Sequence, residues 1–166
     1  MGVLSTAEDR HDGIISLLEE NFGPVQMSSP VMDFPFTDYY DDEMGGRPVR
    51  YLLLFRDLVD PSALAGIKIR TNALEKLFAS EAGGRTVNLD PGILSLSSLI
   101  LASCKDRSHR IPLQDGVYAE TTLIYQSHDF RKLPWTYADY GSDAVRAVLR
   151  SFREKYRESL KTTQKT

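Results

Sequence analysis

The polar side chains that could do chemistry lie in three short stretches of the chain, and the first of them ends a predicted strand. It holds Arg85, Asn88 and Asp90, followed by Pro91 and Gly92. Side chains two residues apart share one face of a strand, so Asn88 and Asp90 are predicted to point the same way. A Pro-Gly pair is typical of the centre of a type II turn, which would begin at Asp90. The stretch is therefore either a plain turn or a turn that holds a ligand.

The second stretch is the polar face of a predicted helix. Four polar residues stand at positions i, i+3, i+4 and i+7, which bring them to one side of a helix: Lys68, Thr71, Asn72 and Glu75. Such a face is commonly solvated. Threonine and asparagine are poor formers of a helix interior, however, so a bound ligand or a tertiary hydrogen bond would account for Thr71 and Asn72.

The third stretch carries a cluster of potential cations between two predicted strands. Four of them fall within six residues: Lys105, Arg107, His109 and Arg110. Such a group suits the recognition of phosphate or carboxylate, although an exposed basic turn would have the same composition. Glu120 lies within the following strand, where glutamate is disfavoured. If Glu120 faces the interior it needs a cationic partner, and this cluster supplies one.

Together the three stretches predict a polar cleft that binds, and could turn over, a small anionic ligand of phosphate-bearing or nucleotide-like type. The predicted ligand-binding residues are Lys68, Asn72, Arg85, Asn88, Lys105 and Arg110. The predicted catalytic residues are Asp90, Glu120 and His109. The two carboxylates would act as general bases or as ligands of a Mg²⁺ cofactor. The residue types fit a site with or without a metal.

Two other function classes fit the same sequence. A single-stranded RNA-binding module would stack bases on the aromatic segment 135–140 and place the basic residues of the last predicted helix on phosphates. The segment 135–140 could equally pack over a sheet. A protein-interaction or scaffold protein without enzymatic activity would use the polar residues as turns and buried ion pairs. The acidic segment 38–43 could bind Mg²⁺ or form a solvated loop.

Several familiar sites are absent from the sequence. It has no glycine motif of the G-x-x-x-x-G-K-[ST] or G-x-G-x-x-G type and no G-x-S-x-G elbow. Its three histidines have no paired spacing, which argues against a histidine-based zinc site. The single cysteine, Cys104, excludes an internal disulfide, and it is expected to be a small buried residue rather than a nucleophile beside His109.

The composition predicts a cytoplasmic protein that is not bound to a membrane. The net charge of −3 gives no overall attraction to nucleic acid or to an anionic membrane. The first residues lack the basic and apolar regions of a secretory signal, and the apolar runs are shorter than a membrane span.

The order of apolar patterns predicts one α+β domain over residues 1–160 and a disordered tail at 161–166. The first half is expected to be ferredoxin-like, βαββαβ, with strands at 2–4, 25–27, 49–58 and 85–89 and helices capped by Thr6 and Asp60. The second helix is expected to bury Leu64, Ile67, Leu74, Leu77 and Phe78. The second half adds an antiparallel β meander, with strands at 94–103, 110–113 and 117–126, and a C-terminal helix at 142–160.

A series of polar motifs runs in order along nearly the whole chain. They are Asp38-Tyr39-Tyr40, Glu43-Met44-Gly45, Lys68, Thr71-Asn72, Glu75, Arg85, Asn88-Leu89-Asp90-Pro91-Gly92, Leu101-Ala102-Ser103, Lys105-Asp106, His109-Arg110, Gly116-Val117-Tyr118-Ala119-Glu120, Trp135-Thr136-Tyr137 and Asp139-Tyr140. With these motifs the chain resembles the prokaryotic proteins grouped as domain of unknown function 4416. The resemblance names no activity and no catalytic residue. It does imply that the polar signatures of that family coincide with the candidate residues.

Overall fold

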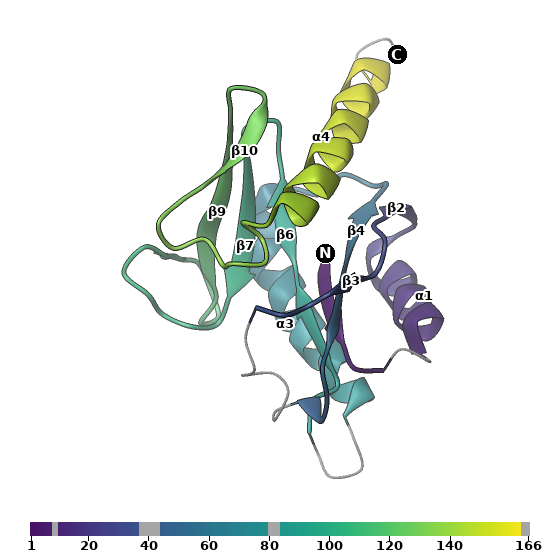
Figure 1. The fold of residues 1–166 in the computed structure, drawn as a ribbon. Helices are drawn as coiled ribbons and strands as arrows, with labels where there is room; N and C mark the ends of the chain where they lie inside the picture. Colours follow the sequence, from purple (N-terminus) through teal and green to yellow (C-terminus); the bar gives the residue numbers. More distant parts are fainter. Residues whose placement is uncertain (8–9, 37–43, 80–83, 164–166) are drawn as a thin grey trace. The chain divides into compact units, whose positions relative to one another are not determined.

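The structure, a computed structural model, describes residues 1–7, 10–36, 44–79 and 84–163. The chain divides into two compact units, Met1–Pro91 and Gly92–Thr166. Each unit contains an antiparallel sheet together with helix (Figure 1), so the predicted α+β class is confirmed. That residues 1–160 act as a single domain stays a prediction.

The first unit combines an antiparallel sheet with helices. In chain order it contains β1 (Gly2–Ser5), α1 (His11–Phe22), β2 (Val25–Ser28), β3 (Met32–Asp33), β4 (Val49–Phe55), the 3₁₀ turn η2 (Pro61–Ala63), α3 (Leu64–Glu75), the 3₁₀ turn η3 (Lys76–Phe78) and β5 (Val87–Asp90). The strands lie in the order β2-β4-β1-β5, each antiparallel to its neighbour, and β3 also pairs with β4. The predicted alternation of strands and helices is present, with β3 as an addition.

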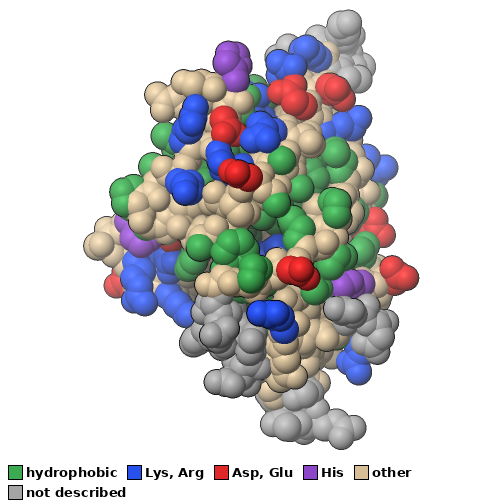
Figure 2. All heavy atoms as spheres, in the orientation of Figure 1, with side chains coloured by type: hydrophobic (Ala, Val, Ile, Leu, Met, Phe, Trp, Pro, Cys, Tyr) green, Lys and Arg blue, Asp and Glu red, His purple; other side chains and the backbone are tan. Residues whose placement is uncertain are grey.

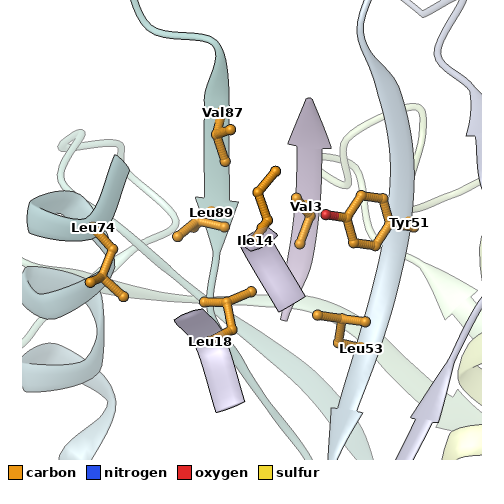
Figure 3. Close-up of a cluster of buried hydrophobic side chains, with 8 residues drawn as sticks. All are labelled: Val3, Ile14, Leu18, Tyr51, Leu53, Leu74, Val87 and Leu89. Atoms are coloured by element: carbon orange, nitrogen blue, oxygen red, sulfur yellow. The ribbon is translucent and has the colours of Figure 1, made fainter. Parts of the chain in front are cut away.

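One face of this sheet carries the core of the first unit (Figure 3). The strands contribute Val3, Tyr51, Leu53, Val87 and Leu89, and the helices contribute Ile14, Leu18 and Leu74. Because alternate side chains of a strand share a face, these strand residues point to the side that α1 and α3 cover. Each fully buried aliphatic side chain contributes about 1.5–3 kcal/mol. Asn88 and Asp90, which alternate with the core residues of β5, therefore belong to its opposite face.

Helix starts follow local capping chemistry, with one correction. The N–H of Ser62 donates to Asp60 Oδ1 (2.8 Å), so Asp60 caps the turn that leads into α3, as predicted. The prediction that Thr6 caps α1 is wrong. Its hydroxyl donates to the carbonyl oxygen of Met44 instead (3.0 Å), and α1 begins only at His11.

The buried side of α3 differs from the predicted apolar stripe. Leu64 and Leu74 are buried, but Leu77 is 66% exposed. The α-helix ends at Glu75, and the tighter 3₁₀ turn that follows changes the angular spacing of the side chains, which removes Leu77 from the stripe. The remaining buried positions of α3 include three polar residues, Lys68, Thr71 and Glu75.

The second unit is an antiparallel meander followed by one long helix. It contains β6 (Gly92–Leu94), β7 (Ser98–Ser103), β8 (Ile111–Pro112), β9 (Tyr118–Gln126), β10 (Asp129–Lys132) and α4 (Asp143–Thr163). The strand order is β10-β9-β7-β6, and β8 pairs with β9. Val145, Leu149 and Phe152 are buried, as the helical spacing predicts. α4 continues to Thr163, beyond its predicted end, and the rest of the predicted tail lies outside the described residues.

Two strands of this unit differ from the prediction. The expected single strand at 94–103 is a hairpin of β6 and β7. Ser95 Oγ accepts a hydrogen bond from the N–H of Ser98 (3.0 Å), which favours a turn over a continuous strand. β10 was not predicted because the turn before it lacks the usual glycine. Ser127 and His128 adopt φ values of 52° and 63° there.

The Pro-Gly pair at 91–92 is not a type II turn. Gly92 does not have positive φ, and the chain passes directly from β5 through Pro91 into β6. Gly92 lies opposite Leu101 in the β6–β7 pair. A Cβ added to Gly92 would meet Leu101 Cδ2 at 2.7 Å and the Ile100 carbonyl oxygen at 2.8 Å. Close approach of two strands, rather than turn geometry, is therefore what requires glycine.

Replacing Gly92 with alanine is expected to lower the free energy of unfolding by about 1–3 kcal/mol, because the backbone oxygen of Ile100 cannot move away without disturbing the strand pair. Gly66→Ala is the matched control. No atom lies within 4 Å of its added Cβ, and alanine in a helix should add about 0.5–1 kcal/mol. Urea unfolding of the two variants measures both effects, and equal stability of the two would contradict the close-approach account.

Candidate functional site

The candidate residues fall into two groups, one in each unit. Lys68, Asn72, Arg85, Asn88 and Asp90 belong to the first unit, and Lys105, His109, Arg110 and Glu120 belong to the second. Most residues of each group take part in a hydrogen-bonded network of that unit. What each network can do chemically follows from its own contacts.

In the first unit, two buried side chains of α3 bind the backbone of β5. Lys68 Nζ donates to the carbonyl oxygen of Leu89 (2.8 Å), and the N–H of Leu89 donates to Glu75 Oε1 (2.7 Å). β5 is the last strand in its sheet order, so among the described residues its outer backbone groups face no further strand. The Lys68–Glu75 pair, 3.9 Å apart, supplies the donor and acceptor that a further strand would supply. Lys68 and Glu75 are therefore edge-capping residues.

The threonine within α3 also has a local explanation. Thr71 is fully buried, and its hydroxyl donates to the carbonyl oxygen of Lys68 (2.9 Å). This hydrogen bond to the preceding turn satisfies the hydroxyl without a ligand. Asn72 is half-buried on the same helix.

The opposite face of β5 continues this network. Asn88 Nδ2 donates to Asp90 Oδ1 (2.9 Å), which confirms that the two side chains share a face. Arg85 Nη1 donates to Asn88 Oδ1 (2.9 Å) and to Glu75 Oε2 (3.3 Å). Arg50 of β4, which the sequence analysis did not single out, pairs with Asp90 (3.1 Å). We call the set Arg50, Lys68, Glu75, Arg85, Asn88 and Asp90 the β5 edge network.

The charge of Asp90 is held by its neighbours. Burial alone would raise the pKa of Asp90, but the charges of Arg50 and Lys68 and the hydrogen bond from Asn88 hold that pKa below its usual value. A carboxylate with a lowered pKa is a weak base near neutral pH. Asp90 therefore fits an ion-pairing role better than its predicted role as a general base.

The lowered pKa of Asp90 predicts a pH-dependent contribution to stability. The folded pKa lies below the unfolded value of about 3.9, so the contribution is present above that pH and is lost as the pH falls through the folded pKa. The stability difference between the protein and Asp90→Asn should be constant above about pH 5 and shrink below about pH 4. Urea unfolding across this range measures the difference. A difference that does not change with pH would contradict the ion-pairing role.

In the second unit, Glu120 is the centre of the network. It lies on β9, is 1% exposed, and accepts hydrogen bonds on both carboxylate oxygens. Arg110 Nε (2.7 Å) and His109 Nε2 (3.0 Å) contact Oε2, and the Thr122 hydroxyl donates to Oε1 (3.2 Å). The expectation that Glu120, if it faces the interior, pairs with the cationic cluster is confirmed, because Glu120 is buried and pairs with Arg110.

Arg110 is held in place by four of its N–H groups. Besides Glu120, it donates to Ser103 Oγ (2.8 Å), to the carbonyl oxygen of Lys105 (2.7 Å) and to the hydroxyl of Tyr137 (2.7 Å). Burial would lower the pKa of Arg110, but Glu120 and Tyr137 raise it, so the guanidinium stays charged. Arg110 compensates the buried carboxylate and orders the loop, which leaves it little capacity for a ligand.

His109 is the group of this network that reaches the surface. Its side chain is 20% exposed, and its ring stacks on Trp135 with a centroid separation of 4.9 Å and an interplanar angle of 10°. Among the described residues, Nδ1 has no hydrogen-bond partner. It does not belong to the buried side-chain nitrogen and oxygen atoms that lack a partner there. The imidazole is therefore oriented by Glu120 and Trp135, with one nitrogen open to solvent.

The aromatic segment around Trp135 is hydrogen-bonded to the edge of β9. β8 and β10 pair with β9 on either side of Thr121 and Thr122, and neither strand reaches these two residues. Trp135 Nε1 donates to the carbonyl oxygen of Thr121 (2.9 Å), and the Thr136 hydroxyl donates to that of Thr122 (2.6 Å). The segment thus packs on the sheet, while Trp135 stays 37% and Tyr137 48% exposed.

An exposed basic loop adjoins this imidazole. Residues 104–108 between β7 and β8 are exposed, including Lys105 and Arg107. Figure 2 shows lysine and arginine side chains gathered beside a histidine at the left of the view, over the segment that joins β7 to β8. Cys104 is exposed too, so the prediction that it is buried is wrong: β7 ends at Ser103, one residue before it. We call His109, Arg110, Glu120, Trp135 and the loop 104–108 the His109 site.

The basic residues of α4 are engaged within the second unit. Arg146 and Arg150 each contact Asp129 of β10 at 2.6 Å, and the guanidinium of Arg153 lies 3.6 Å from the ring centre of Tyr125. In Figure 2, acidic and basic side chains alternate over α4 at the upper right. The helix therefore presents a mixed surface rather than a continuous basic one.

In the part of the chain that the structure describes, no three His, Cys, Asp or Glu side chains are grouped to hold a metal ion. None of its helices is both long and apolar enough to cross a membrane. The acidic segment 38–43, predicted to bind Mg²⁺ or to be solvated, lies outside the described residues.

Comparisons with known proteins give one match. The model of a family described as domain of unknown function (DUF4416) matches residues 1–156 of the chain. No curated protein and no solved structure matches it.

Proposed function

The chain belongs to the family described as domain of unknown function (DUF4416), and we propose that it binds a small anionic, phosphate-bearing or nucleotide-like ligand at the His109 site. The observation that carries the proposal is the surface imidazole of His109, which is held by buried Glu120 and stacked on Trp135. Fixed polar groups of this kind recognise ligands well, because little conformational entropy is lost on binding.

The surroundings of the imidazole suit an anion. Lys105 and Arg107 lie on the exposed loop beside it, and Arg110 neutralises Glu120 so that the buried carboxylate does not repel a negative ligand. Lysine and arginine bind phosphate and carboxylate through charge-assisted hydrogen bonds. The β5 edge network is a weaker candidate, because Lys68, Asn88 and Asp90 bind other groups of the protein.

Trp135 offers a direct assay, because it is the only tryptophan of the chain and belongs to the site. Its fluorescence would be titrated with inorganic phosphate, a sugar phosphate, a nucleotide and a small carboxylate. Lys105→Ala should weaken the binding of any ligand found by about tenfold, the usual loss for one charge-assisted hydrogen bond. Lys76→Ala, an exposed lysine of the first unit, is the matched control and should change nothing. Absence of any response at millimolar ligand would contradict the proposal.

Single-stranded RNA binding is a second proposal, and the exposed rings of Trp135 and Tyr137 favour it. The order β2-β4-β1-β5 also supports the ferredoxin-like interpretation of the first unit. The mixed charges of α4 argue against RNA binding, because the helix offers no continuous basic surface for phosphates. A short RNA that binds with an affinity falling steeply with salt would favour this alternative. A scaffold role predicts no response to RNA or to small anions. We also propose a cytoplasmic location, since a sequence with a single cysteine cannot form an internal disulfide.

A further inference from the structure

We propose that Glu120 is a positioning residue: it holds His109 in the Nε2–H tautomer, so that Nδ1 is the proton acceptor of the His109 site. The acceptor would serve a hydroxyl group of the ligand or a water beside it. This use of the acceptor rests on the proposed function, whereas the assignment of the tautomer does not.

The hydrogen-bond geometry carries the assignment. His109 Nε2 lies 3.0 Å from Glu120 Oε2. An ionised carboxylate can only accept hydrogen bonds, so Nε2 must carry the proton. In the neutral ring the lone pair then belongs to Nδ1, which has no partner within the described residues. One ring nitrogen is thus committed to the protein and the other is presented to the surface.

Glu120 cannot be the acceptor itself, although the sequence predicted that role. Its side chain is 2% exposed, and its two oxygens already accept hydrogen bonds from Arg110, His109 and Thr122. Arg110 Nε lies 2.7 Å from Oε2 and balances the charge of the carboxylate. Glu120 therefore acts through His109 rather than on a ligand.

The ring of His109 is also fixed in its plane. Trp135 stacks on it, and the indole is itself held by the hydrogen bond from Nε1 to the carbonyl oxygen of Thr121 (2.9 Å). A base acts well only if its lone pair has a defined direction. The hydrogen bond to Glu120 and the stack together define the direction of Nδ1.

The first test is ¹⁵N NMR of the histidine side chains at a pH where the imidazoles are neutral. His109 is expected to show the shift pattern of a protonated Nε2 and an unprotonated Nδ1. A protonated Nδ1 would overturn the proposal. No ligand is needed, so this result is separate from failure or success of the binding titration.

Two variants distinguish positioning from a purely structural role. Glu120→Leu removes both oxygens that could accept a hydrogen bond from Nε2, so the Nδ1–H form should appear in the spectrum. Thr122→Val removes the contact to Oε1 while leaving Oε2 beside His109, so the tautomer should be unchanged. Unchanged tautomers in both variants would overturn the proposal. If Glu120→Leu does not fold, the spectrum of the unaltered protein is the deciding measurement.

Chemical modification gives an independent reading on the folded protein. Diethyl pyrocarbonate acylates an unprotonated imidazole nitrogen, and ethanol and carbon dioxide leave. Mass spectrometry should find His109 modified, with exposed His128 as the internal reference for an unhindered ring. Modification of His128 without His109 would contradict an open Nδ1.

Discussion

Replacing Glu120 with glutamine is expected to lower the free energy of unfolding by about 3–5 kcal/mol, because it removes the charge that compensates a buried guanidinium. Arg110 would keep its contacts to Ser103 and Tyr137 but lose its anionic partner. Urea unfolding followed by Trp135 fluorescence measures the loss. A loss below about 1 kcal/mol would show that the pair is not effectively buried.

A double-mutant cycle isolates the Arg110–Glu120 pair from the rest of the network. Arg110→Met and Glu120→Leu each leave one buried charge unpaired, whereas the double variant leaves neither. The double variant should therefore be more stable than the sum of the single losses predicts, by at least about 1 kcal/mol. Additive losses would contradict a coupled pair.

Replacing Glu75 with leucine is expected to cost about 2–4 kcal/mol of stability, the second large effect. It leaves the N–H of Leu89 without an acceptor and removes the carboxylate beside Lys68 and Arg85. Thermal or urea unfolding measures the loss.

Two further variants test whether edge capping explains this effect. Glu75→Gln retains an oxygen that can accept from Leu89, so it should cost less than the leucine variant. Glu20→Ala removes an exposed carboxylate of α1 and should stay within about 0.5 kcal/mol of the unaltered protein. Equal losses of stability for Glu75→Gln and Glu75→Leu would show that the ion pairs of Glu75, and not its hydrogen bond to the edge of β5, cause the effect.

Features set by neighbouring residues could be predicted from the sequence. The period of two placed Asn88 and Asp90 on one face, and the spacing of apolar residues placed Val145, Leu149 and Phe152 on the buried side of α4. A glutamate within a strand correctly indicated a buried partner from the cluster at 105–110. These inferences depend only on local geometry and on the cost of an unpaired buried charge.

Features set by distant segments could not be predicted. No local pattern shows that α3 lies along the edge of β5. The sequence therefore left a solvated face, a bound ligand and a tertiary hydrogen bond open for the polar side of this helix. In the structure Lys68 and Glu75 are buried and make tertiary hydrogen bonds to Leu89. The role of Gly92 was missed for another reason: it depends on the hairpin of β6 and β7, where the sequence predicted one continuous strand at 94–103.

Arg50 was missed although the sequence carries a usable signal for it. It is a charged side chain within the apolar strand β4, the same kind of signal as Glu120 in β9. The ion pairs of Asp90 and Glu120 predict that substitution of either residue lowers the stability of the fold.

The most direct test of the central claim is a ¹H–¹⁵N NMR titration of the protein with inorganic phosphate, a sugar phosphate and a nucleotide. The account predicts that at least one of them shifts the Trp135 indole, the His109 side chain and the amides of residues 104–108. The amide of Leu89 and the side chain of Asn88 should not move, because their hydrogen bonds belong to the β5 edge network. Shifts confined to Leu89 and Asn88, or none at millimolar ligand, would contradict the claim that the His109 site binds the anion.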